Sequence, residues 1–254
     1  MRQLRILIGY ELRHYFYSPF FYAICALFLF LMGIVFFISL KVYADFTQEE
    51  PLMMQLFKSM WLPSFFIVPV LTTKAIVSEK VTHLFDTLLL LRVRRFFVVL
   101  AKFIAIYLTY MGLWIAVSFF FELAQWSAPS LAHFSNFATP QVRYGGLFFM
   151  NLIGGVIIAF GLLVSAEAKT PATSMVASAV GIFLFLVSGQ LFKYASGISL
   201  QQAEIFSSLY DNWNVFFQLE DFCHGIFDTR IIIAYISVTA ALLATTAITL
   251  RKTE

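Results

Sequence analysis

Residues 69–102 read PVLTTKAIVSEKVTHLFDTLLLLRVRRFFVVLAK, and this stretch decides how the chain is organised. An apolar run that contains Pro63 and Pro69 leads into it, and a second apolar run leaves it from about Phe96. The basic residues of the stretch are Lys74, Lys80, Arg92, Arg94, Arg95 and Lys102. A basic segment between two apolar runs is typical of a cytoplasmic loop in a membrane protein, because Lys and Arg concentrate on that side.

The composition agrees with a membrane protein. The chain has 254 residues, of which 61% are hydrophobic and 12% are charged, whereas soluble domains are about 45–50% apolar and about 25% charged. The net charge of +3 is small and unevenly spread, so no nucleic-acid partner is expected.

Six apolar runs are each close to the roughly 20 residues that a helix needs to cross a bilayer. They lie at about residues 20–40, 59–77, 96–121, 144–166, 172–192 and 231–250. Pro69 lies within the second run, and we expect it to kink that helix. The sequence thus predicts an all-α polytopic membrane protein with one transmembrane domain over residues 1–254.

Residues 1–18 predict a short amphipathic helix. Its apolar positions recur at helical spacing, at Leu4, Ile8, Leu12 and Tyr15. Arg2, Arg5 and Arg13 add positive charge, which favours a helix anchored in the lipid headgroups of an inner leaflet. A mobile tail is the alternative.

The basic residues also predict the orientation. With the N-terminus inside, the inner segments hold Arg2, Arg5, Arg13, Lys74, Lys80, Arg92, Arg94, Arg95, Lys102, Lys169, Arg251 and Lys252. The outer segments hold only Lys41, Lys58, Arg143, Lys193 and Arg230. This bias predicts that both termini are cytoplasmic.

The predicted outer loops differ in length and character. Residues 41–58 and 122–143 form two loops of similar size, and residues 193–230 form a longer one that is rich in aromatic and aliphatic side chains. This longer loop favours short helices on the outer leaflet, or a surface for a periplasmic partner.

The sequence predicts no catalytic residue, cofactor or metal ligand. No histidine lies within an apolar run, and the Asp221 and His224 pair is too sparse to indicate a metal site. The chain contains no Gly-x-x-x-x-Gly-Lys-Ser/Thr pattern, so we expect no phosphate-binding loop and no ATPase activity of its own. A transport protein without its own energy source must take energy from another subunit.

The segment at residues 78–91 is the predicted contact with the subunit that supplies this energy. Apolar side chains recur there at helical spacing, at Val81, Leu84, Phe85, Leu88 and Leu91, with polar residues on much of the remaining surface. An amphipathic helix between two spans can dock into a groove of a soluble partner. An interfacial helix without a partner is the alternative.

Three motifs resemble those of ABC-2 type transporter permeases. The first comprises Pro69, Leu71 and Thr72, followed by Glu79-Lys80, Asp86, Leu88-Leu89 and Ala101-Lys102. The second, at residues 11–22, reads ELRHYFYSPFFY and is similar to the family's E-x-x-x-Y-F-x-S-P-x-A-Y opening. The third, at residues 222–230, reads FCHGIFDTR and is similar to F-x-x-G-x-I-D before the last span. Among such permeases, the chain most resembles those of gliding motility and of nitrous-oxide reductase maturation.

The resemblance implies a half-transporter. In the inner membrane of a bacterium, two permease copies, or one copy and a related permease, would pair above two ATPase subunits and act as an exporter. The ATPase subunits would bind ATP and magnesium. The ATPase contact would involve Glu79, Lys80, His83, Leu84, Phe85, Asp86, Thr87 and Leu88. The chain departs from the family at His83-Leu84, where Gly-Thr is usual, and at Asp86, where Glu is usual.

Two other functions remain open. The subunit could pass ATP energy to a periplasmic protein without moving solute in bulk, and the long loop at 193–230 favours this alternative. A membrane enzyme or redox subunit is the other.

Overall fold

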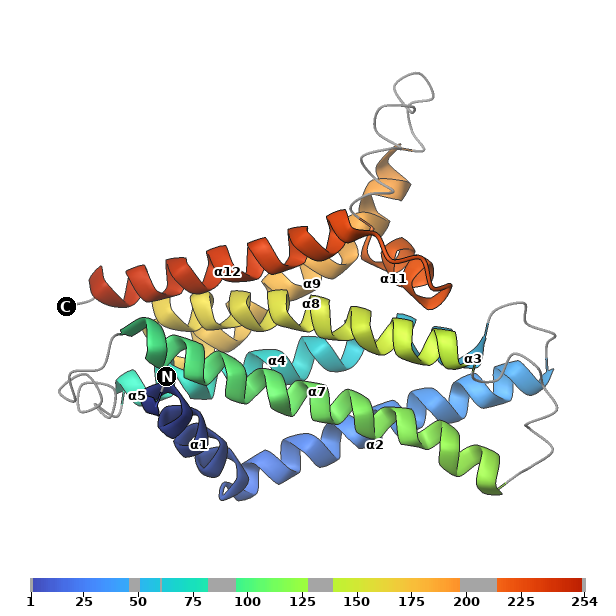
Figure 1. Cartoon of the computed structure of the whole chain (residues 1–254), viewed down its shortest axis with the longest axis horizontal. Coiled ribbons are helices and arrows are strands. Elements are labelled where there is room, and N and C mark those ends of the chain that lie inside the picture. The colour runs from blue at the N-terminus through green and yellow to red at the C-terminus, as the bar shows by residue number, and fades with distance from the viewer. Residues whose placement is uncertain are drawn as a thin grey trace.

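The computed structural model describes residues 2–45, 51–59, 61–81, 95–127, 139–196 and 214–252, and these residues form an all-helical bundle (Figure 1). Its helices are α1 (Arg2–Phe16), α2 (Pro19–Asp45), α3 (Leu52–Lys58), α4 (Trp61–Ala75), α5 (Val77–Val81), α7 (Arg95–Ser127), α8 (Pro140–Glu167), α9 (Pro171–Ser196), α11 (Val215–Cys223) and α12 (Thr229–Lys252).

Six helical segments among the described residues are long and apolar enough to cross a membrane. They are Pro19–Lys41, Leu62–Val81, Phe96–Ala124, Pro140–Glu167, Pro171–Ser188 and Thr229–Leu250. Each overlaps one of the six predicted spans, so the prediction of an all-α fold with six helices able to cross a membrane is confirmed, and these helices indicate a multi-pass membrane protein. The second segment reaches Val81 because only a single turn residue, Ile76, separates α4 from α5.

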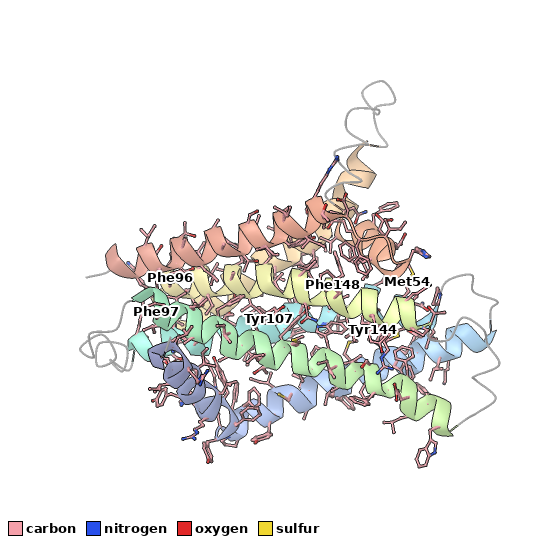
Figure 2. All side chains as sticks on the ribbon, viewed as in Figure 1. Met54, Phe96, Phe97, Tyr107, Tyr144 and Phe148 are labelled. Atoms are coloured by element: carbon pink, nitrogen blue, oxygen red, sulfur yellow. The ribbon has the colours of Figure 1, made fainter. Side chains whose placement is uncertain are left out.

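The bundle has two distinct ends (Figure 1). The terminal end carries α1, α5 and the last turn of α12, and the distal end carries α3 and α11. Side chains mark the same ends in Figure 2, where Phe96 and Phe97 lie at the terminal end and Met54 and Tyr144 at the distal end. Both described ends of the chain therefore lie on one side of the bundle, as an even number of spans requires.

Helix α8 is the centre of the bundle. It contacts α3, α4, α7, α9, α11 and α12. A Cβ atom at Gly145 would collide with the backbone of Phe222 in α11, and one at Gly146 would collide with the ring of Phe57 in α3. Glycine at these positions lets the neighbouring helices approach closely, which is how small residues act in membrane bundles.

The short helix α3 differs from the predicted outer loop at residues 41–58. Its apolar side chains are buried at the distal end: Leu52, Met53, Met54, Leu56 and Phe57. The ring of Phe57 lies 5.8 Å from that of Trp114 in α7, and Trp114 lies 5.8 Å from Phe28 in α2. This segment is therefore part of the core, because its side chains are mostly apolar.

The outer surface of the bundle is apolar. Helix α12 exposes Ile233, Ile236, Val238 and Ile248, and α2 exposes Leu27, Phe30, Phe37 and Ile38. Soluble monomers rarely expose continuous apolar surface of this kind. Such a surface suits the hydrocarbon of a lipid bilayer.

Candidate functional site

Lys102 forms a buried ion triad at the terminal end. Its side chain is fully buried, and its ammonium group donates to Glu11 Oε1 at 2.9 Å and to Glu79 Oε1 at 2.7 Å. Glu11 belongs to α1, Glu79 to α5 and Lys102 to α7. The ion triad therefore joins three segments that are distant in the sequence.

The local sequence places Glu11 and Lys102 on the inward faces of their helices. Glu11 lies three residues after Ile8 and four before Tyr15, so it shares the face of α1 that packs against the bundle. Lys102 lies between the buried residues Val98 and Ile106 of α7, each one helical turn away.

Burial makes the ion triad important for the packing of α1, α5 and α7. A buried ammonium group requires anionic partners, because the loss of water costs several kcal/mol for each ion. The pairing holds α1 and α5 against α7 as long as all three charges are buried. Ionisable groups buried in a membrane protein usually mark function.

A second set of contacts fixes α5 to the end of α8. The backbone N–H of Val77 donates to Ser165 Oγ at 3.1 Å, and the Lys80 ammonium donates to the carbonyl of Ala166 at 2.5 Å. The last carbonyls of a helix lack intrahelical partners, and a cation there also complements the helix dipole. Helix α5 is therefore held to α1, α7 and α8.

The span that leads into α5 is also held by polar contacts. Thr73 Oγ1 in α4 donates to Ser174 Oγ in α9 at 3.2 Å, and the hydroxyls of Ser64 and Tyr110 lie 3.4 Å apart. Hydroxyl contacts of this kind hold helices together in lipid. Movement of α5 would therefore reach α7, α8 and α9.

The predicted coupling residues fall into two groups. Glu79 and Lys80 belong to α5, and the contacts above join both to the bundle. The other predicted residues lie outside the described residues: His83, Leu84, Phe85, Asp86, Thr87 and Leu88.

The remaining predicted positions lie in α1 and α4. Arg5 and Arg13 are exposed on α1, and Arg2 is its first residue. Pro69 is buried within α4, and the hydroxyl of Thr72 donates to the carbonyl of Val68 at 2.9 Å in the same turn.

Sequence reasoning missed Glu11 and Lys102 as site residues. A signal was present in each case. Glu11 interrupts the apolar face of α1 at the helical spacing of Ile8 and Tyr15, and Lys102 lies within the third apolar run. Neither signal identifies the partner, because the pairing spans 91 residues of sequence.

The distal end has its own polar contacts. Glu220 of α11 pairs with Lys58 of α3 at 2.7 Å, and the hydroxyl of Tyr235 in α12 donates to Gln218 Oε1 at 2.7 Å. Asn214 caps α11 by accepting a hydrogen bond from the N–H of Phe216 at 3.1 Å. Helices α3 and α11 thus form a packed cap over this end of α8.

No group of three or more His, Cys, Asp or Glu within the described ranges could hold a metal ion. Comparison with known proteins adds no relative: no protein-family model matches the chain, and no curated protein matches it.

Proposed function

We propose that the chain is the transmembrane permease subunit of an ABC-2 type exporter, driven by a separate ATPase. The ion triad Glu11–Lys102–Glu79 is the observation that supports this most directly. It holds the start of the 78–91 segment to the membrane body. Force applied to that segment would therefore pass into the spans rather than bend a loose loop.

The proposed coupling route begins in α5. A partner ATPase docks on residues 78–91 and moves α5 as it closes on ATP. Lys80 passes this movement to α8 through the carbonyl of Ala166, and Glu79 passes it to α1 and α7 through Lys102. ATP and magnesium belong to the partner chain.

In this proposal the terminal end is the cytoplasmic end, in the inner membrane of a bacterium. The bias of basic residues supports that orientation. Because α1 and the end of α12 lie on one side of the bundle, it applies to both described ends of the chain. The exposed Arg5 and Arg13 would bind anionic lipid headgroups there. The lipid-exposed apolar surface leaves room for a second copy or a related permease.

A mechanotransmission subunit is the alternative function, with little solute transport of its own. The cap formed by α3 and α11 favours it. Ile226 and Phe227, which follow α11, are 61% and 53% exposed. Exposed apolar side chains beside this packed cap would suit a periplasmic protein partner.

Affinity purification of the tagged chain in mild detergent, followed by mass spectrometry, tests both functions. We expect a subunit with a phosphate-binding loop to co-purify, and to stay bound when the distal residues Ile226 and Phe227 are changed to serine. A periplasmic protein that is lost with those two changes would favour mechanotransmission. If no ATPase co-purifies in several detergents, the proposal is wrong.

A further inference from the structure

A hollow lies at the terminal end where α1 meets α2, α4 and α5. Its volume is about 40 Å³. A cavity that holds one water has a volume of about 10–15 Å³ by the same measure. The space therefore admits about three or four non-hydrogen atoms. The proposed route of force uses the ion triad beside this hollow but leaves the hollow itself without a role.

Tyr15 supplies a buried polar group to the hollow. The residue lines it and is only 6% exposed, and its hydroxyl has no hydrogen-bond partner among the described residues. Burial, with the negative charges of Glu11 and Glu79, raises the pKa of Tyr15 well above its ordinary value. The hydroxyl is therefore neutral and can both accept and donate a hydrogen bond. Buried hydroxyls are nearly always paired, so one without a partner calls for a ligand or a water.

Charges of both signs line the same hollow. Glu11 and Glu79 contribute carboxylates, while Lys74 and the exposed His14 are basic. The Lys74 ammonium lies 3.3 Å from the centre of the Phe20 ring, which holds it at the start of α2. A group that carries both a positive and a negative charge would complement this lining.

The hollow also continues into apolar surface. Phe20, Phe21 and Ile24 of α2 line it, together with Leu71 of α4. Leu27 and Phe30 lie about one and two helical turns beyond Ile24 in α2, and both are exposed on the apolar outer surface of the bundle. A ligand with a polar head and long apolar chains could thus place each part in suitable surroundings.

We infer that this hollow binds the headgroup of an aminophospholipid with a phosphoethanolamine head. The primary ammonium enters the hollow, where it donates hydrogen bonds to the Tyr15 hydroxyl and the Glu11 carboxylate. The phosphate stays near Lys74 and His14, and the acyl chains follow α2. The ethanolamine unit has four non-hydrogen atoms from nitrogen to ester oxygen, which matches the space.

Other common headgroups fit this chemistry less well. Choline is cationic but has no N–H to donate to Tyr15, and it is bulkier. Glycerol has hydroxyls but no positive charge for the carboxylates. The inference needs only that the chain spans a membrane, so it does not depend on the proposed ATPase.

Native mass spectrometry of the delipidated full chain tests the inference. Phosphatidylethanolamine, phosphatidylcholine and phosphatidylglycerol with identical acyl chains are titrated separately. We expect phosphatidylethanolamine to bind about tenfold more tightly than the other two. Tyr15→Phe should weaken the binding of phosphatidylethanolamine about three- to tenfold, which is the effect of losing one hydrogen bond. Tyr10→Phe is the matched control, because Tyr10 is exposed on the same helix, and it should change nothing.

Two results would contradict the inference. Equal affinities for the three lipids, or equal loss in the Tyr15→Phe and Tyr10→Phe variants, would overturn the inference. Soluble O-phosphoethanolamine distinguishes a lipid from a free metabolite: as a competitor it should displace the lipid only at a large excess, because it lacks acyl chains. Binding of the soluble compound as tight as that of the lipid would overturn the lipid assignment.

The unfolding temperature of each variant, measured without lipid, checks that Tyr15→Phe leaves the protein folded.

Discussion

The Lys102 ammonium lies 2.7 Å from Glu79 Oε1, with the lysine side chain fully buried and the glutamate 15% exposed. Glu79 lies near the start of the 78–91 segment on which we propose that an ATPase docks, and Lys102 belongs to the third span. A charge pair thus joins the proposed input of force directly to a transmembrane helix.

Removal of the Lys102 charge should destabilise the protein strongly. Lys102→Met would leave Glu11 and Glu79 without their shared cation, and breaking a buried pair in this way costs about 3–5 kcal/mol. The change is measured as the unfolding free energy in detergent. The matched control is Arg143→Gln, since the Arg143–Glu122 pair is partly exposed and should contribute less than about 1 kcal/mol. Equal losses in the two variants would mean that the ion triad is unimportant for stability.

Cross-linking should locate the proposed ATPase contact. In a chain in which Cys25 and Cys223 are replaced by serine, we expect a cysteine at position 85 to cross-link to the co-purified ATPase. A cysteine at Trp126, which is 84% exposed at the distal end of α7, serves as the control and should not cross-link to it. A cross-link from position 126 and none from position 85 would contradict the proposed orientation.

The close approach of α8 and α11 should be sensitive to one methyl group. Gly145→Ala would place a Cβ against the Phe222 carbonyl, and the backbone must shift to admit it. Overpacking of this kind costs about 1–3 kcal/mol. Gly112→Ala, in α7, is the control, because nothing lies within 4 Å of its Cβ position. We expect only Gly145→Ala to lower the unfolding temperature, and a similar fall in both would argue against this packing.

The Cys223 thiol should be unreactive in the folded protein. It is buried, and desolvation raises its pKa from 9.0 to about 12. Maleimide, which needs the thiolate, should label it at pH 8 only after denaturation. A Trp126→Cys variant, as an exposed control, should be labelled at once in the folded state.

The same pKa predicts how stability depends on pH. Between about pH 9 and 12 the unfolded chain loses the Cys223 proton while the folded chain keeps it. Unfolding therefore becomes easier as pH rises through this window. Cys223→Ala should remove this contribution, and an unchanged pH dependence would show that the thiol does not carry it.

The amino-acid sequence by itself determined the number, order and approximate limits of the six spans. Each span is a run of about 20 apolar residues, so it depends on composition close by in the chain. The break at Ser18-Pro19 between α1 and α2 is likewise local, because proline restricts the residue before it.

Only the tertiary structure decided which residues meet. Glu11 and Lys102 are separated by 91 residues, and no local pattern pairs them. The central position of α8, the burial of α3 and the hollow beside Tyr15 depend on how several helices pack at once. A hydropathy pattern does not distinguish one apolar helix from another. Small residues and buried charges determine which helices become neighbours, through contacts that form only in the folded bundle.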